Sequence, residues 1–107
     1  MKNDDIKLFT DNEGIWCQES SGSPFGIKWN EIFSISGYTM EYFDTPEIEI
    51  EFDFEYGEYF RINETWDGFD NVVHAINKRS LFLEKDWLDK VRNVGEDAEI
   101  YIIWRSS

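Results

Sequence analysis

The residues that could perform chemistry are few and far apart in this chain. It has one histidine, His74, and one cysteine, Cys17, whereas a protein metal site of the common kind needs several such ligands. Strand alternation sets Cys17 between Trp16 and Gln18, where a small apolar side chain that fills space is the ordinary role. His74 falls on the polar face of a predicted helix, in solvent. We therefore expect no catalytic residue, no metal site and no cofactor.

Motifs for covalent or phosphate chemistry are also missing from the sequence. It contains no glycine-rich phosphate loop, no dinucleotide fingerprint and no Gly-x-Ser-x-Gly turn. The acidic residues lack the spacing and central glycine of a calcium loop. Two carboxylates can act as general acid and base, but on an open strand face they lack the burial that separates their pKa values. The sequence favours a binding protein over an enzyme.

The strongest pattern is an unbroken alternation of acidic and apolar residues over positions 47–56. A period of two is that of a β-strand, so the acids share one face and the apolar residues share the other. The predicted partner-binding residues are these acids and the tyrosine that a hairpin would set beside them: Glu47, Glu49, Glu51, Asp53, Glu55 and Tyr59.

Three interpretations of this acidic row stay open: a binding surface, protection of an edge strand from pairing, and plain solvation. Binding is preferred because Thr, Lys or Gln would serve an exposed strand equally well. On an exposed row, replacing Glu49, Glu51 and Asp53 by Lys should leave the fold intact. Arg61 should be partly neutralised by Glu51, which lies opposite it in the expected register.

Charge points to the kind of partner. The chain has 23 acidic and 10 basic residues, a formal net charge of −13, and residues 29–70 hold twelve of the acids and one base. Such a surface repels phosphate backbones and anionic lipids, so we expect no nucleic acid and no membrane as partners. Acidity concentrated in one segment favours a basic protein partner.

The elements that must position the acidic row follow from periodicity and turn residues. Strands are predicted at residues 6–9, 15–18, 25–29, 33–42, 47–56 and 99–104, with one more strand after Gly57. A helical turn is predicted at 30–32, and helices are predicted at 67–79, which Asp67 would cap, and at 84–93. A bulge is expected near Gly37.

The hairpin around the acidic row has a definite expected register. A three-residue loop ending in Gly57, whose backbone would be left-handed, connects its strands. The loop would pair Phe52 with Phe60, Ile50 with Ile62, Glu51 with Arg61, and Asp53 with Tyr59. Apolar pairs then meet on the buried face and polar pairs on the other.

Residues 1–107 should form a single domain, because the chain is short and its 19 aromatic residues exclude disorder. The element order predicts an α+β fold: a mostly antiparallel sheet of six or seven strands, two helices packed on one face, and a C-terminal strand. That last strand is nearly all apolar, which predicts cover on both faces. The expected aromatic core residues are Trp29, Phe52, Phe54, Phe69 and Trp87.

The compartment is inferred from what the sequence lacks. No apolar run is long enough to span a bilayer, and the first residues do not resemble a signal peptide. A single cysteine permits no internal disulfide. We expect a cytoplasmic protein.

Several spaced motifs resemble a known group of proteins. They are a strand ending in Ile27-Lys-Trp29, the isoleucines Ile32 and Ile35, the stretch Glu64-Thr-Trp-Asp-Gly68-Phe69-Asp70, the pair Trp87 and Val91, and a closing strand that ends in Trp104-Arg105. Over about residues 25–105 the chain is similar to small bacterial immunity proteins of polymorphic toxin and contact-dependent growth inhibition systems. Some of those proteins have a pleckstrin-homology-like architecture.

The resemblance implies a cytoplasmic inhibitor, with a monomer favoured, that binds and neutralises a cognate antibacterial toxin. Many such toxins are nucleases, whose basic surfaces an acidic inhibitor would occlude. Two alternatives remain: an adaptor or binding module of pleckstrin-homology type, and an acidic mimic of nucleic acid that inhibits DNA-binding proteins.

Overall fold

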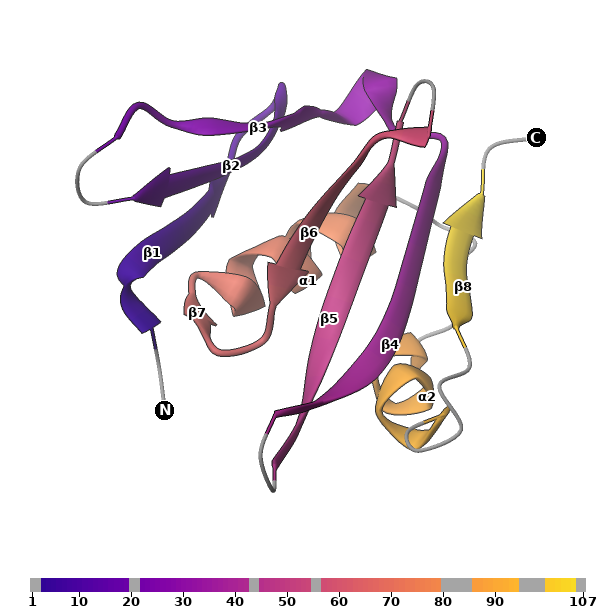
Figure 1. Ribbon diagram of the computed structural model, residues 1–107. Helices are drawn as coiled ribbons and strands as arrows, with labels where there is room; N and C mark the ends of the chain where they lie inside the picture. Colours follow the sequence, from indigo (N-terminus) through magenta and orange to yellow (C-terminus); the bar gives the residue numbers. More distant parts are fainter. Residues whose placement is uncertain are drawn as a thin grey trace.

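A computed structural model of the protein describes residues 3–19, 22–42, 45–54, 57–79, 86–94 and 100–105 (Figure 1). Its strands are β1 (Asn3–Thr10), β2 (Gly14–Glu19), β3 (Phe25–Lys28), β4 (Ser34–Tyr42), β5 (Thr45–Asp53), β6 (Tyr59–Asn63), β7 (Trp66–Asp67) and β8 (Tyr101–Arg105). Its helices are the 3-10 turn η1 (Trp29–Glu31), α1 (Phe69–Arg79) and α2 (Trp87–Val94).

The strands form two four-stranded sheets. The first sheet has the order β3-β2-β1-β7, with β7 parallel to β1, and the second has the order β6-β5-β4-β8 with every pairing antiparallel. The predicted α+β class is confirmed. What the sequence did not predict is the division of the strands into two sheets with the core between them.

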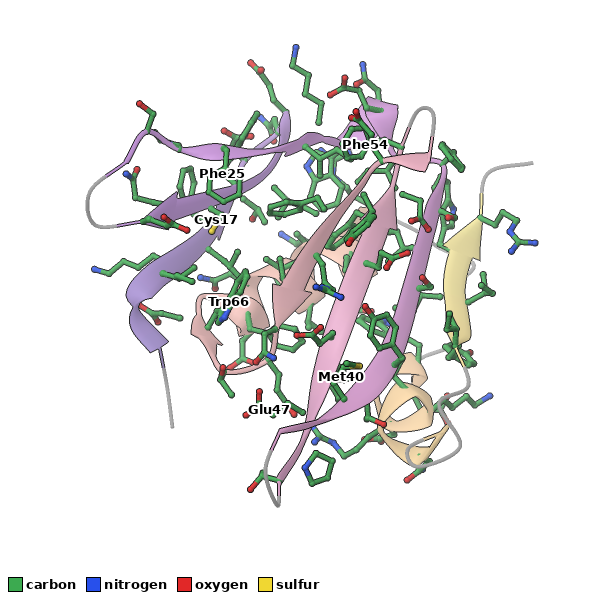
Figure 2. The ribbon with its side chains drawn as sticks, viewed as in Figure 1. Cys17, Phe25, Met40, Glu47, Phe54 and Trp66 are labelled. Atoms are coloured by element: carbon green, nitrogen blue, oxygen red, sulfur yellow. The ribbon has the colours of Figure 1, made fainter. Side chains whose placement is uncertain are left out.

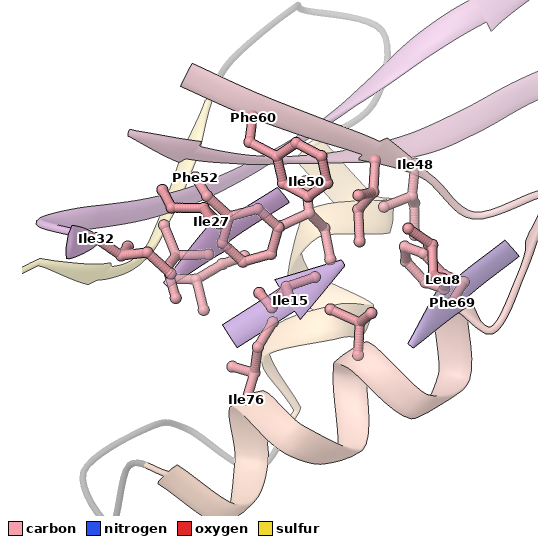
Figure 3. Packing of buried hydrophobic residues seen from close by; sticks show 14 of the residues in the cluster. Leu8, Ile15, Ile27, Ile32, Ile48, Ile50, Phe52, Phe60, Phe69 and Ile76 are labelled. Atoms are coloured by element: carbon pink, nitrogen blue, oxygen red, sulfur yellow. The ribbon is translucent and has the colours of Figure 1, made fainter. Parts of the chain in front are cut away.

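The core lies between the second sheet, the first sheet and α1 (Figure 3). Strand β5 contributes Ile48, Ile50 and Phe52, each with no exposed surface. Helix α1 contributes Phe69, Val72 and Ile76, which are buried because their spacing puts them on one side of the helix. Over the described residues the apolar half of the alternation therefore points inward at Ile48, Ile50 and Phe52, as predicted.

The hairpin of β5 and β6 has the predicted register. All four expected pairs occur: Phe52 with Phe60, Ile50 with Ile62, Glu51 with Arg61, and Asp53 with Tyr59. Gly57 has φ +77°, the left-handed conformation that the loop requires. Phe54 N donates to Glu58 O at 3.0 Å and closes the loop, while Glu55 and Tyr56 lie outside the described residues.

Helix α1 begins after a glycine that packs against the first sheet. Gly68 has φ +91°, and a Cβ there would collide with the carbonyl oxygen of Leu8 in β1. Asp67, expected as the helix cap, lies in β7 beside β1. The close approach of Gly68 to Leu8 therefore fixes where α1 meets the first sheet.

Helix α2 packs on β4 and β8. Its Trp87 is 1% exposed and donates its indole Nε1–H to Asn77 Oδ1 of α1 at 2.6 Å, which joins the two helices. Residues 84 and 85, part of the predicted helix, lie outside the described residues. Of the expected aromatic core, Phe52, Phe69 and Trp87 are buried, while Trp29 and Phe54 are partly buried against it.

Two expectations about strands are wrong. Gly37 is not a bulge, because β4 pairs with β5 without interruption through Gly37 and Ile50. The irregularity lies on the other side of β4, where Ile103 falls between the pairs Ile35–Trp104 and Ser36–Ile102. Strand β8 is also not covered on both faces, because its Ile102 lies on the outer face of the second sheet and is 44% exposed.

Candidate protein-interaction surface

The second sheet has an outer face, turned away from the core, to which three neighbouring strands contribute polar side chains. Residues paired directly across antiparallel strands point to the same side. We call this set the acidic face: Ser34 and Tyr38 of β4, Glu47, Glu49, Glu51 and Asp53 of β5, and Tyr59, Arg61 and Asn63 of β6. Figure 2 looks onto this side of the sheet, with Glu47 and its register partner Met40 labelled.

Glu49, at the centre of the acidic face, is buried. It is 5% exposed. Asn63 Nδ2 donates to its Oε2 at 2.9 Å, and Arg61 Nε lies 3.3 Å from its Oε1. The expectation of a fully open acidic row is therefore wrong at this position, because the side chains of the neighbouring strand β6 cover it.

Asn63 connects the acidic face to the turn after β6. Its amide nitrogen donates to Glu47 Oε1 at 3.0 Å as well as to Glu49. Its amide oxygen accepts from Thr65 N at 2.8 Å and from Thr65 Oγ1 at 2.7 Å. The buried Asn63 amide thus holds the carboxylates of Glu47 and Glu49 in fixed positions, and the contacts with Thr65 fix the amide itself.

Glu51 and Asp53 form a second hydrogen-bonded group. Ser34 Oγ donates to Asp53 Oδ2 at 2.7 Å. Burial raises the pKa of Glu51, and the hydrogen bond and negative charge of Asp53 raise it further, against the opposing effects of Arg61 and Tyr38. The charged form of Glu51 is therefore less favourable here than on a fully exposed strand.

Arg61 is the cation of the acidic face. Its register partner is Glu51, as predicted, but its ion pair is the diagonal one with Glu49. Arg61 Nη1 also donates to Tyr38 Oη at 3.2 Å, and its Cζ lies 5.7 Å from the centre of the Tyr59 ring. Arg61 thus forms its ion pair with the buried Glu49, while its charge still lowers the pKa of Glu51.

The structure brings together five of the six predicted site residues. Glu47, Glu51 and Asp53 are partly buried, Glu49 is buried, and Tyr59 is 53% exposed at one margin. Glu55 lies outside the described residues. The carboxylates are thus a hydrogen-bonded array and not a row of independent charges.

Sequence reasoning missed an apolar margin on the same side of the sheet. Met40 is 39% exposed beside Glu47, and Ile102 of β8 is 44% exposed beside Ser36. Ile100, two positions before Ile102 and 59% exposed, continues the strand alternation. The signal needed to find this margin was the pairing of β8 with β4, because that register puts Ile102 on the outer face of the second sheet.

The remaining reactive residues are placed as the sequence predicts. Cys17 is 1% exposed, and burial raises the pKa of its thiol, with a smaller contribution from Glu19. His74 is exposed on α1. Within the described residues no group of three or more His, Cys, Asp or Glu side chains is arranged to hold a metal ion. The helices of that same part of the chain are too short or too polar to cross a membrane.

Comparison of the chain with protein-family models, with curated proteins and with solved structures finds no match. The acidic face and its apolar margin are therefore the features from which a function can be inferred.

Proposed function

We propose that this protein is an immunity-type inhibitor that binds a basic antibacterial toxin domain through the acidic face and neutralises it by occlusion. The observation that carries the proposal is the array of carboxylates on an outward sheet face, held by hydrogen bonds from Asn63 and Ser34 and by the ion pair of Glu49 with Arg61. It lies in the segment with twelve acids and one base. No reaction is catalysed in this scheme.

The hydrogen bonds matter for binding because they fix the carboxylates before the partner arrives. Free glutamate side chains lose conformational entropy when a partner orders them, and that loss weakens binding. Glu47 and Glu49 are already held by Asn63. A Lys or Arg of the partner then finds acceptors in place, and charge attraction at a distance speeds the encounter.

The margins of the acidic face supply large apolar side chains that a partner can bury. Hot spots in protein interfaces are commonly large side chains that lose water on binding. Tyr59 at one margin and Met40 with Ile102 at the other are exposed and large enough for this role. The proposed interface is an acidic centre between two apolar margins, which fits a basic protein better than a nucleic acid or a lipid surface.

The partner can be sought by co-expressing the protein with the product of the reading frame immediately upstream, followed by pull-down and a growth-protection assay. We expect a stable complex and rescue of growth. If the protein instead captures many DNA-binding proteins equally, the nucleic-acid mimic replaces this proposal. If neither the pull-down nor the growth assay shows an interaction, the proposed function is wrong.

A matched pair of variants tests the surface. Glu47→Gln/Glu51→Gln/Asp53→Asn removes three formal charges from the acidic face with almost no change of shape. The control Asp70→Asn/Asp86→Asn/Asp89→Asn removes three from exposed positions on or beside the helices. Stopped-flow association at low salt should slow roughly tenfold for the first and less than about twofold for the control. Equal slowing of both variants would mean that net charge, and not this face, determines association.

A further inference from the structure

A groove lined by basic and aromatic side chains, unlike the acidic face, lies between the β1–β2 turn, η1 and the last turns of α1. It consists of two hollows of about 480 Å³ and 510 Å³ that share Asn12, Trp29 and Arg79 in their walls. Phe9, His74 and Lys78 complete the first hollow on one side, and Lys28 lines the second. We call the two together the Trp29 groove, and neither the acidic face nor the proposed inhibition uses it.

Hydrogen bonds make the walls of the Trp29 groove rigid. Asp11 Oδ1 accepts from Glu13 N at 2.8 Å and from Gly14 N at 2.9 Å, which closes the turn. Trp29 Nε1 donates to Asp11 O at 3.0 Å, and Trp29 N donates to Glu13 O at 2.9 Å. Arg79 Nη2 donates to Asn12 O at 2.8 Å. Turn, η1 and α1 are thereby joined.

Arg79 is held in place at the junction of the two hollows. Its Cζ lies 4.3 Å from the centre of a Trp29 ring, a cation–π contact, and one donor is used at Asn12 O. A guanidinium has five N–H donors. The described contacts therefore fix the position of Arg79 and leave donors to face a ligand.

The charge of the groove is opposite in kind to that of the acidic face. Lys28, Lys78 and Arg79 line it, against the carboxylates of Asp11 and Glu13. Asp11 accepts from two backbone N–H groups, and neither lysine forms an ion pair with another described residue. At physiological salt the Debye length is about 8 Å, so more distant acids are screened and these cations determine which small ions are attracted.

The groove also has an apolar wall and neutral donors. Phe9 is 40% exposed beside Ala75, and the amides of Asn12 and Asn71 lie in the same hollow. Its volume falls within the range of small-molecule sites, about 300–1,000 Å³. Arg recognises phosphate through paired N–H donors, and an exposed aromatic ring offers a surface for stacking a planar ring.

From this arrangement we infer that the Trp29 groove binds a small organic phosphate of nucleoside monophosphate size, with the phosphate at Arg79 and Lys78 and the ring against Phe9. A long nucleic acid is disfavoured, because it would extend over the acidic remainder of a chain of net charge −13. A single small anion meets only the local cations.

The test is a ¹H–¹⁵N NMR titration of the full chain with AMP, with inorganic phosphate and adenosine as separate probes. The indole N–H of Trp29 is the reporter, because it lies in the groove wall. We expect saturable shifts of this signal with a Kd of about 1 mM or less for AMP, and binding at least about fivefold weaker for phosphate or adenosine alone.

Lys78→Gln should weaken AMP binding at least about fivefold, and Lys28→Gln, in the wall of the adjoining hollow, should weaken it less. Arg105→Gln, an exposed cation on β8, is the control and should change it less than about twofold. The inference is overturned if AMP at 10-fold its expected Kd leaves the Trp29 signal in place, if adenosine binds as tightly as AMP, or if both lysine variants bind like the wild type. Because the acidic face is not involved, these outcomes are independent of toxin binding.

Discussion

At the scale of single residues, Asn63 determines whether the acidic face is a stable array. It is 5% exposed and serves two carboxylates and the Thr65 backbone and hydroxyl at once. Asn63→Ala should lower the free energy of unfolding by about 2–4 kcal/mol, because it removes the donor that Glu47 and Glu49 share and the acceptor of Thr65. Urea denaturation measures this loss. Asn93→Ala, at an exposed site on α2, is the control and should change stability little.

A loss under about 0.5 kcal/mol for Asn63→Ala would contradict the hydrogen-bonded array.

The burial of Glu49 also reverses an expectation from the sequence. Replacing Glu49, Glu51 and Asp53 by Lys together would set a buried ammonium beside Arg61, which costs stability. Neutral isosteres, in contrast, keep the shape of the face.

Glu51 gives the acidic face a pH dependence whose sign is fixed. Burial, and then Asp53, raise its pKa in the folded state above the ordinary value of 4.5. Above the unfolded pKa the folded state therefore binds more protons than the unfolded state, so stability falls as the pH rises through the folded pKa. Glu51→Gln should raise the urea midpoint at pH 7 and change it less at pH 4, where the carboxyl is mostly protonated in both states. Equal differences at both pH values would contradict a raised pKa of Glu51 in the folded state.

At the scale of elements, the contact between α2 and the second sheet depends on Gly37. A Cβ at Gly37 would lie 2.7 Å and 2.9 Å from the two methyl carbons of Val91 and 3.3 Å from Ile103 Cδ1. Gly37→Ala should therefore cost about 1–3 kcal/mol through overpacking. The double variant Gly37→Ala/Val91→Ala should lose less stability than the sum of the losses of the two single variants, because removing the Val91 methyl groups makes room for the new Cβ. Strict additivity, measured by denaturation, would show that α2 does not press on this strand.

How far the sequence predicts each element depends on whether the decisive contacts are local. The β5–β6 register was predictable because Gly57 and the alternating pattern belong to one hairpin. The role of Gly37 was not predictable, because the side chain that leaves no room for a Cβ there belongs to Val91, more than fifty positions later. A glycine in a strand suggests a bulge when the helix that packs on it is unknown.

The candidate site shows the same limit. Alternation correctly put Glu49 and Glu51 on one face, but whether they are exposed depends on Arg61 and Asn63 of the neighbouring strand. Exposure of Ile102 depends on its position on the outer face, which follows from the pairing of β8 with β4 and not from β8 alone. Sequence patterns assign faces well, and sheet order then determines what covers them.

At the scale of the whole molecule, net charge and ion pairs oppose one another. The chain carries −13, and repulsion among like charges destabilises its compact state. Two described ion pairs, Arg61–Glu49 and Arg92–Glu64, stabilise it, but the arginine side chains are 43% and 54% exposed. Their carboxylates, Glu49 and Glu64, are 6% and 19% exposed, but solvent at the arginines screens the attraction within each pair. Repulsion should therefore outweigh attraction in the dependence of stability on salt.

This balance predicts that sodium chloride stabilises the protein. Raising it from about 0.01 M to 1 M shortens the Debye length from about 30 Å to 3 Å and screens the repulsion. We expect Tm to rise by at least about 4 °C, the shift that about 1 kcal/mol causes in a domain of this size. Chloride is preferred to sulfate, which strengthens apolar burial by itself. The Tm of the Glu47→Gln/Glu51→Gln/Asp53→Asn variant should rise less with salt, because this variant has three fewer formal charges. A Tm that falls with salt would mean that attraction between opposite charges outweighs repulsion. The acidic segment would then stabilise the fold and not destabilise it.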